Sequence, residues 1–338
     1  MAKLSVVILN YNGRHHLERF LGSVVANTSG DAEVVIADNH STDDSLVWLR
    51  LNYPELRVIA LDRNYGFAGG YNRALSEVDS RYVLLLNSDV EVTAGWWQPL
   101  VETLDSDPSI AAVAPKLRSV ERRDEFEYAG AAGGYIDYLG YPFCRGRILS
   151  KVERDEGQYD TPQEVFWGSG AALCCRRDCF FEVGAFDETF FAHMEEIDLQ
   201  WRMQLAGYRI LSVPSATVYH LGGGTLPASS FKIYLNHRNN LAMLFKCSSP
   251  VQRVVVAIVR PFTDMAEALA HLLTLHPHRA WAVVRAWATF IGWHRRLAMA
   301  RREVVRRTDV KHIYRFSIVG MENWEASAPS SPHAVTII

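Results

Sequence analysis

The sequence lacks the features that mark membrane-spanning and secreted proteins. It contains no uninterrupted apolar run of the roughly 20 residues that a membrane-spanning helix needs. We expect no signal peptide, because the N-terminus passes almost directly into the apolar segment Leu4–Leu9. These absences favour a cytoplasmic protein, or one held at the inner face of the cell membrane.

Cysteine is scarce. The chain has five cysteines, an odd number without zinc-finger spacing: Cys144, Cys174, Cys175, Cys179 and Cys247. This pattern favours reduced thiols in a cytoplasm over a secreted disulfide framework. Cys175 and Cys179 could bind a metal, but cysteines of this kind more often pack as small apolar groups.

Basic charge is sparse in most of the chain and concentrated near its C-terminus. The formal net charge is −3, whereas Pro250–Arg315 holds 12 Lys and Arg against 4 Asp and Glu. This stretch lacks a recognised nucleic-acid-binding module, so we expect no nucleic-acid partner. The 338 residues, 49% of them hydrophobic, suit one large domain with an appendage. We place the domain at 1–245, a basic, Trp-containing helical appendage at 246–320 and a flexible tail at 321–338.

Apolar segments alternate with helical patterns near the N-terminus. The predicted strands are Leu4–Leu9, Glu33–Ala37, Arg57–Leu61 and Tyr82–Asn87. This alternation predicts an α/β fold with a doubly wound, mostly parallel sheet flanked by helices. A strand as apolar as the fourth is expected to be buried on both faces.

Polar residues follow the predicted strands. They are Asn10–Gly13 after the first strand, Asp38–Ser45 after the second and Asn87–Asp89 after the fourth. Parallel sheets bind ligands in the crevice outside the carboxyl ends of their strands. Asn87 and Asp89 would offer oxygen ligands to Mg²⁺ or Mn²⁺ beside a bound diphosphate. A simple polar turn is the alternative for these residues, and a helix-capping turn is the alternative for Asp38.

A glycine-rich segment, Arg63–Asn72, follows the third strand. Its glycines predict a sharp turn that approaches a ligand closely before a helix over Asn72–Val78. An ordinary turn is the alternative. The G-x-G-x-x-G fingerprint is absent, so a nicotinamide cofactor is not expected.

Three carboxylates, Glu195, Glu196 and Asp198, fall in the first turn of another predicted helix. The helix dipole favours negative charge there, which is itself one explanation for them. Confining three carboxylates also raises the proton affinity of at least one, as a general base requires. Asp198 and Arg202 are spaced i,i+4 and can pair, which would leave the two glutamates free to act.

Two further segments are candidates for the site. Small residues around Trp167–Gly170 permit close approach to a substrate, although tight strand packing explains them equally well. His220 ends a strand pattern before a glycine run, where an imidazole can join oxygen ligands on a cation. A hydrogen-bonded structural histidine is the alternative. Residues 118–164 look irregular and are expected to form a variable loop region.

The C-terminal pattern is helical from Val251 to Arg307. Tryptophans alternate with arginines in this stretch: Trp281, Trp287 and Trp293 lie near Arg279, Arg285, Arg295 and Arg296. Such a mixture suits an interfacial helix on an anionic membrane. Packing against the rest of the chain, or against another subunit in a homo-oligomer, is the alternative.

Seven motifs and their order along the chain resemble those of the inverting nucleotide-sugar glycosyltransferases of family 2, in particular the rhamnosyltransferase-like bacterial branch. They are VVILNYNG, IADNHSTDDS, RNYGFAGGYN, LLLNSDV, GSGAALCCRR, FFAHMEEIDLQWR and VYHLGGGT, within residues 3–245. The resemblance implies a GT-A fold, a nucleotide-diphosphate sugar donor and a divalent cation.

The resemblance also implies roles for matching residues. The donor side would comprise Asn10, Tyr11, Asn12, Asp38, Asn64, Gly70, Asn72, Asn87 and Ser88, with Asp38 on the nucleoside base. The cation would be held by Asp89, His220 and Asn87; Asn87 and Asp89 match the outer positions of the family's D-x-D motif, with Asn replacing the first Asp. Glu196 matches the catalytic base, Glu195 is the competing candidate, and Asp198 stands with them. The expected acceptor side is Trp167, Gly168, Ser169, Gly170 and Arg238, the last as a phosphate contact or a helix-packing residue.

The expected reaction follows from these roles. Glu196 would take a proton from an acceptor hydroxyl as that oxygen displaces the diphosphate from the anomeric carbon, with inversion. The acceptor would be a cell-surface glycan precursor, such as a polyprenyl-linked one. A sugar-nucleotide nucleotidyltransferase is one alternative, but Asn10–Gly13 is not the phosphate-gripping signature that it needs. A non-catalytic nucleotide- or glycan-binding subunit is the other, and Asn87 keeps that alternative open.

Overall fold

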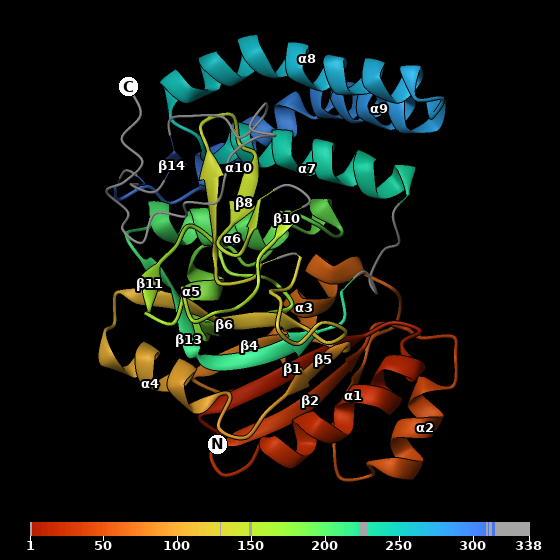
Figure 1. Cartoon of the computed structure of the whole chain (residues 1–338), viewed down its shortest axis with the longest axis vertical. Coiled ribbons are helices and arrows are strands. Elements are labelled where there is room, and N and C mark those ends of the chain that lie inside the picture. The colour runs from red at the N-terminus through yellow and green to blue at the C-terminus, as the bar shows by residue number, and fades with distance from the viewer. Residues whose placement is uncertain are drawn as a thin grey trace.

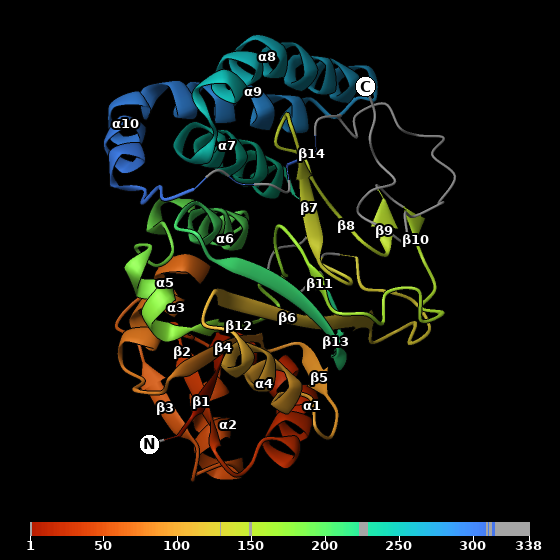
Figure 2. The same ribbon diagram turned by 90° about the vertical axis from the view of Figure 1, so that its left-hand side faces the viewer.

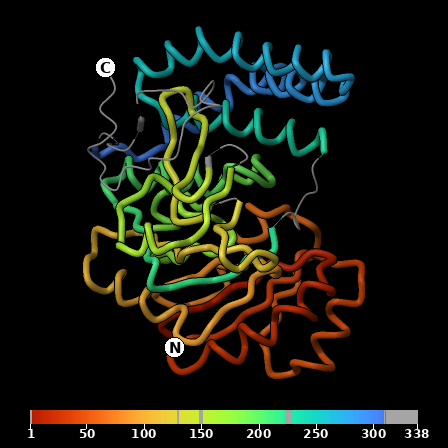
Figure 3. The backbone as a smooth tube through the Cα atoms, viewed as in Figure 1, coloured from red at the N-terminus to blue at the C-terminus, as the bar shows by residue number. Residues whose placement is uncertain are grey.

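A computed structural model describes residues 2–128, 130–148, 151–222, 229–308, 310 and 313–314. The chain rises from a sheet near the N-terminus to a layer of helices near the C-terminus (Figure 1). The colour gradient of the backbone trace follows the same direction (Figure 3). The predicted tail 321–338 and the glycines after Gly222 lie outside the described residues.

The main sheet has nine strands in the order β11-β13-β6-β12-β4-β1-β2-β3, and β5 pairs with β13. The strands are β1 (Leu4–Asn10), β2 (Ala32–Asp38), β3 (Arg57–Ala60), β4 (Tyr82–Asn87), β5 (Val90–Val92), β6 (Ile110–Ser119), β11 (Gln163–Glu164), β12 (Ala172–Arg176) and β13 (Arg209–His220). The predicted sheet flanked by helices is therefore confirmed. It is a mixed sheet: β3, β2, β1 and β4 run parallel, whereas β12 is antiparallel to both β4 and β6.

Strand β4 explains how this sheet is stabilised. Val83 and Leu85 pack into one hydrophobic core, while Leu84 and Leu86 pack into the core on the opposite face. All four side chains are fully buried, as expected for a strand covered by helices on both faces. Burying each such side chain contributes about 1.5–3 kcal/mol. The two cores therefore fix the strand so that its polar end, Asn87–Asp89, emerges at the sheet edge.

Helices cover both faces of the sheet. They are α1 (Arg14–Asn27), α2 (Ser45–Asn52), α3 (Gly66–Ser76), α4 (Gln98–Ser106), α5 (Arg177–Glu182) and α6 (Glu195–Leu205). The helix expected to start at Asn72 begins at Gly66 instead, so most of the predicted glycine-rich turn is helical. The start is set by Gly66 itself, whose φ of +71° is easily adopted only by glycine.

The prediction of a loop region over residues 118–164 was wrong. This stretch contains β7 (Gly134–Asp137), β8 (Pro142–Cys144), β9 (Arg147–Ile148) and β10 (Lys151–Val152). They form a second sheet, which β14 (Ile313–Tyr314) completes by pairing with β7. This sheet stands beside the C-terminal helices (Figure 2). Its strands are too short to give a clear periodic signal, and their pairing depends on distant segments.

Four helices close the molecule: α7 (Ser230–Cys247), α8 (Pro250–Leu273), α9 (Pro277–Gly292) and α10 (His294–Glu303). They confirm the predicted helical pattern. α7 lies between the part of the molecule that holds the main sheet and the outer helices, and α8 is outermost (Figure 1). No helix in the described residues is long and apolar enough to cross a membrane. All five cysteines are buried and free, as expected for thiols that pack as apolar groups.

Candidate active site

Two cavities meet at the carboxyl ends of β1, β2 and β4. The smaller cavity, of about 270 Å³, is lined by residues from the first 89 positions together with Phe191 and Ala192. The larger one, of about 500 Å³, is lined by the second half of the sheet, α6 and the start of α7. Phe67, Asn87 and Ala192 line both. The two cavities therefore adjoin at a common wall, which suits a reaction between two bound molecules.

The smaller cavity is bordered by loops that hold one another by hydrogen bonds. The Asn10 amide donates to Asp38 Oδ1 at 3.0 Å, and Asn12 Oδ1 accepts the backbone N–H of Thr42 at 2.7 Å. Asn12 and the half-exposed Tyr11 line the cavity together with Asn64, Ser88 and Asp89. Asn10 and Asp38 are buried beneath this wall and do not line it. Their observed contacts shape the loop.

Two residues expected on the donor side lie elsewhere. Gly70 packs inside α3, where a Cβ atom would come within 2.8 Å of the Leu9 side chain. The Asn72 amide donates to the Phe186 carbonyl at 2.9 Å, and its Oδ1 accepts the Phe186 N–H at 3.0 Å. Both residues therefore fix how α3 packs and do not reach the cavity. A helix that starts at Gly66 turns them away from it.

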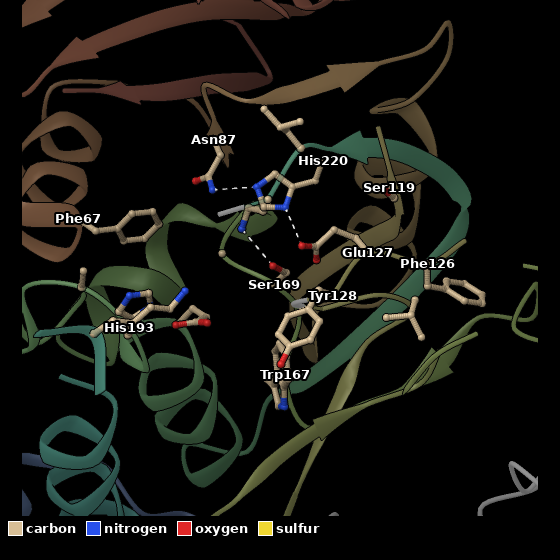
Figure 4. Close-up of a pocket in the computed structure, with 18 of the residues that line it drawn as sticks. Phe67, Asn87, Ser119, Phe126, Glu127, Tyr128, Trp167, Ser169, His193 and His220 are labelled. Atoms are coloured by element: carbon tan, nitrogen blue, oxygen red, sulfur yellow. Dashed lines mark hydrogen bonds and ion pairs between the residues drawn. The ribbon is translucent and has the colours of Figure 1, made fainter. Parts of the chain in front are cut away.

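Asp89 and His220 meet at the junction of the cavities. His220 Nε2 lies 3.2 Å from Asp89 Oδ1 and 3.5 Å from the Asn87 amide nitrogen. Its other ring nitrogen, Nδ1, lies 3.3 Å from Glu127 Oε1. Figure 4 shows the imidazole between Asn87 and Glu127. The meeting of Asp89 and His220 was expected from the sequence, whereas Glu127 was not, because it lies in the stretch expected to be a loop.

Electrostatics reinforce this cluster. Burial lowers the pKa of His220, but the hydrogen bonds that its ring donates to Asp89 and Glu127 outweigh burial and raise that pKa to about 10. Burial raises the pKa of Asp89, but the His220 hydrogen bond and charge hold it below its ordinary value. Asp89 Oδ2 is buried with no hydrogen-bond partner among the described residues. A carboxylate oxygen left in this state can accept a cation.

The acidic cluster at the start of α6 divides into two parts. Glu195 and Glu196 line the larger cavity, and Oε2 of each is buried without a hydrogen-bond partner in the described part of the chain. Burial raises the pKa of both, and for Glu195 the neighbouring Glu196 and Asp198 raise it further. A carboxylate with a raised pKa facing a cavity has the properties of a general base.

Asp198 has a different environment. It is fully buried, and it pairs with Arg202 at 2.8 Å and with Lys246 at 2.9 Å. The predicted i,i+4 pair is therefore present. Because Asp198 does not line either cavity, the expectation that it takes part in the chemistry is not supported. Its ion pairs instead fix α6 against α7.

The expected acceptor residues are only partly together. Trp167 and Ser169 line the larger cavity (Figure 4), and so does Gly170. Gly168 does not; it donates its N–H to Gln200 Oε1 at 2.7 Å, and a Cβ there would meet Ala114. Arg238 is buried in α7 and donates to the Thr189 and Phe190 carbonyls, both at 3.0 Å. Of its two predicted roles, helix packing is the observed one, because these carbonyls and the rings of Tyr234 and Trp293 surround it.

His193 belongs to the motif FFAHMEEIDLQWR, but the sequence predicted no role for it. It lines the larger cavity, and its Nε2 atom is buried without a hydrogen-bond partner among the described residues. Burial, assisted by Lys232, lowers the pKa of His193 to about 4, so the ring is neutral. His15 and His16, which line the smaller cavity, were also missed. Their position directly after the polar turn of β1 was the available signal.

Comparison with known proteins agrees with this architecture. The family described as "Glycosyl transferase family 2" matches residues 5–178, more than half of the chain. An N-acetylglucosaminyl-diphospho-decaprenol L-rhamnosyltransferase of Mycobacterium tuberculosis is 32% identical over 235 residues, which cover 64% of this chain and 75% of that protein. A low-salt glycan biosynthesis hexosyltransferase of Haloferax volcanii is 24% identical over 242 residues, covering 70% of this chain and 73% of its own.

Two solved structures share the fold. GalNAc-T7, solved with UDP, GalNAc and Mn²⁺, has a TM-score of 0.60 at 20% identity and covers 77% of this chain and 51% of its own. A mannosyltransferase from Pyrobaculum calidifontis, solved with GDP-Man and Mn²⁺, has a TM-score of 0.51 at 15% identity. The match covers 90% of this chain and 85% of the mannosyltransferase chain. The fold is therefore that of a GT-A glycosyltransferase. The chain belongs to glycosyl transferase family 2.

Proposed function

We propose that this enzyme transfers a sugar from a nucleotide-diphosphate donor to a hydroxyl group of a lipid-linked glycan precursor, with inversion at the anomeric carbon. The observation that carries the proposal is the shared wall of the two cavities, Phe67, Asn87 and Ala192. The donor would occupy the smaller cavity with its sugar at this wall. The acceptor would approach through the larger cavity, where Glu196 faces it.

A divalent cation would fit beside Asp89 and His220. The buried, unpartnered Asp89 Oδ2 atom would supply one oxygen ligand, and His220 Nε2 would supply one nitrogen ligand once the cation displaces its proton. This pair suits Mg²⁺ or Mn²⁺ completed by diphosphate oxygens. No group of three or more His, Cys, Asp or Glu side chains arranged to hold a metal occurs in the described residues. The donor diphosphate would therefore complete the site. The cation would supply positive charge to the departing diphosphate.

The chemistry would be completed by Glu196, or by Glu195 beside it. The base accepts the proton of the acceptor hydroxyl while the oxygen of that hydroxyl forms the new bond to the anomeric carbon. The bond from that carbon to the diphosphate oxygen breaks on the opposite face, and the nucleoside diphosphate departs. The neutral His193, which lines the same cavity, would hydrogen-bond the acceptor.

The proposal of a lipid-linked acceptor rests on the similarity to the mycobacterial rhamnosyltransferase, whose name specifies a diphospho-decaprenol carrier. A lipid carrier requires access to a membrane, and α8 presents a suitable surface. Its outward side chains are apolar and exposed: Val251, Val254, Ile258, Phe262, Met265, Leu269, Leu272 and Leu273. We propose that this α8 stripe lies on the inner face of the cell membrane.

Two observations favour a lipid surface for the α8 stripe. Four of the eight arginines in the described helices α8 to α10 are exposed, against two exposed acidic residues, and this excess of positive charge complements anionic headgroups. The stripe also runs along a 24-residue helix at the outermost edge of the molecule. Of the two explanations for the C-terminal tryptophans, packing is observed for two of them. Trp287 donates to Asp264 at 2.9 Å and Trp293 stacks on Arg238, whereas Trp281 is exposed.

Vesicle flotation tests whether the α8 stripe binds a membrane surface. The wild type should float with vesicles of phosphatidylglycerol and phosphatidylcholine, and Phe262→Glu with Leu269→Glu should remain in solution. Leu51→Glu is the matched control, because Leu51 is an exposed leucine on the distant helix α2. Failure of the wild type to float, or a concentration-dependent dimer that the double variant abolishes, would assign the stripe to another partner.

A donor screen tests the reaction itself. The full-length protein is incubated with nucleotide sugars and Mn²⁺ or Mg²⁺, and slow donor hydrolysis and thermal stabilisation are recorded. At least one donor should produce both effects, and EDTA should abolish them. A protein that neither hydrolyses nor is stabilised by any nucleotide sugar would contradict the proposed function.

A further inference from the structure

A five-residue segment, Phe190–Met194, separates the two cavities. Phe191 lines the smaller cavity, His193 lines the larger one and Ala192 lines both. We call this stretch the partition segment. Glu195 and Glu196 follow it directly as the first residues of α6, so its position sets the position of the proposed base.

The partition segment has an unfavourable backbone conformation. Phe191 lies at the centre of a γ-turn with φ 65° and ψ −59°, closed by a hydrogen bond of 2.8 Å from the Ala192 N–H to the Phe190 carbonyl. This hand of γ-turn is rare and strained. His193 and Met194 follow with φ of 69° each. Three strained non-glycine residues persist in such a segment only when their surroundings hold them in place.

Asn239 on α7 supplies that constraint. Its side-chain amide lies within hydrogen-bond distance of three partition carbonyls: those of Phe190 at 3.0 Å, Ala192 at 2.9 Å and His193 at 2.8 Å. The amide oxygen accepts a hydrogen bond from Arg238 Nε at 2.9 Å, which fixes the orientation of the amide. Asn239 is fully buried, so water cannot replace it. It touches neither cavity.

The same segment also contacts the donor side. The Phe191 carbonyl accepts the backbone N–H groups of Phe67 at 2.7 Å and Ala68 at 3.2 Å, in the first turn of α3. Any side chain at Gly66 would collide with Phe191, because a Cβ atom would lie 2.5 Å from its ring. The partition segment is therefore held on one side by α7 and on the other by the helix that borders the donor cavity.

We propose that Asn239 is a positioning residue for sugar transfer, which holds the partition segment so that the base faces the donor at the junction of the cavities. This inference rests on the proposed function. It makes a helix outside the sheet part of the active-site framework. It also explains why a buried asparagine, rather than an apolar residue, occupies this position: only a donor of hydrogen bonds can hold three carbonyls together.

The test compares two buried amides of the same kind. Asn239→Asp keeps the shape of the side chain but replaces the NH₂ group with an oxygen that repels the three carbonyls. Gln252→Glu is the matched control, because Gln252 is equally buried and its amide donates to the Tyr138 carbonyl at 3.0 Å, away from the partition segment. Asn239→Ser, which keeps one short donor, is the second variant.

Positioning predicts a specific result. Per folded molecule, Asn239→Asp should lower kcat by about 100-fold, the effect expected when a reacting group is displaced by about 1 Å. The acid limb of its kcat–pH profile should move as the surroundings of the base change, and Asn239→Ser should be intermediate. Gln252→Glu should lower the melting temperature yet retain the wild-type kcat and pH profile.

The inference is overturned if Asn239→Asp has the kcat and pH profile of the wild type, or if Gln252→Glu changes both in the same way. If Asn239→Asp does not fold, Asn239→Ser against Gln252→Glu decides by the same criteria. Transfer or donor hydrolysis by the wild type, measured first, separates this result from failure of the proposed function.

Discussion

The His220 imidazole lies 3.2 Å from the Asp89 carboxylate although 131 residues separate them in the chain. Strand β13 carries His220 at its last residue, and β5, which follows Asp89, pairs with the end of β13. The backbone N–H of Leu221 donates to the Asp89 carbonyl at 3.1 Å and closes this junction. The sheet itself therefore brings the imidazole to the carboxylate.

Asp89→Asn should weaken cation binding. The substitution keeps the shape of the side chain but removes the charge next to the unpartnered oxygen, so Mn²⁺ affinity in the presence of a nucleoside diphosphate should fall at least about tenfold. Paramagnetic titration with Mn²⁺ measures this directly. Asp43→Asn, in an exposed loop, is the control. Equal Mn²⁺ affinity in wild type and Asp89→Asn would exclude Asp89 as a ligand.

Glu127→Gln should also weaken cation binding, although Glu127 would not touch the ion. A carboxylate on the far side of a histidine ring fixes its tautomer and orientation, and losing such a partner costs about 10–100-fold in metal affinity. Glu127 stands 3.3 Å from His220 Nδ1. The same Mn²⁺ titration measures the effect. A change in acceptor affinity alone, with Mn²⁺ binding intact, would instead assign Glu127 to acceptor binding in the larger cavity that it lines.

Glu196→Gln should abolish turnover and leave donor binding intact. Removing a general base costs about 100- to 10,000-fold in rate, whereas the amide keeps the size of the side chain. Glu195→Gln is the natural comparison, because both glutamates line the same cavity. Single-turnover rates and donor titration calorimetry separate the two variants. If only Glu195→Gln is inactive, the base is Glu195.

The pH dependence of kcat should show an acid limb above the range of an ordinary glutamate. Burial raises the pKa of Glu196, and a base acts only when deprotonated, so activity should rise as the pH passes through this raised pKa. A rate profile between pH 5 and 9 measures the limb. A flat profile down to pH 5 would show that the base titrates as an exposed carboxylate does.

The raised pKa of Glu196 also predicts that stability changes with pH in the direction opposite to activity. The folded state holds a proton on Glu196 at pH values where the unfolded chain has lost it, so the free energy of unfolding should fall as the pH rises through that window. Glu196→Gln has no charge to bury. Its stability relative to wild type should therefore increase between pH 5 and 8, by about 1.4 kcal/mol for each unit of pKa shift. Urea unfolding at several pH values measures the difference.

Arg238→Lys should destabilise the fold without changing donor affinity. The guanidinium group donates to two backbone carbonyls and stacks against two aromatic rings, which a lysine ammonium cannot reproduce. Loss of buried charged hydrogen bonds predicts a decrease of about 2–4 kcal/mol in the free energy of unfolding. Urea unfolding and donor titration give the two readouts. Weaker donor binding with unchanged stability would instead support a phosphate contact, the other role that the sequence suggested for Arg238.

The sequence predicted the features that depend on local pattern. The strands, their polar ends and the pairing of Asp198 with Arg202 follow from periodicity and i,i+4 spacing, and the structure contains each of them. The segments against which Gly70 and Arg238 pack were not predictable in this way. Each of these two residues is buried against a segment far away in the chain, and a residue pattern does not specify its tertiary partner.

The second sheet was not predicted, for a related reason. Strands of two to four residues, such as β9 and β7, give too little alternation to distinguish them from loops. Glu127 was missed with them, because nothing in its immediate sequence marks a residue that contacts a histidine 93 positions later. The partition segment was quoted as part of a motif, yet its γ-turn depends on Asn239 and is visible only in three dimensions.

The linings of the two cavities come from different parts of the chain. Apart from Phe191 and Ala192, the smaller cavity is built from the first 89 residues, whereas Glu127, Tyr128, Val152 and Lys232 of the larger one come from later segments. With the donor in the smaller cavity, as we propose, mutations that remodel the later segments could accumulate while nucleotide recognition is preserved. This modular construction would let a lineage of such enzymes diversify the polymers that it extends and keep a single activated sugar.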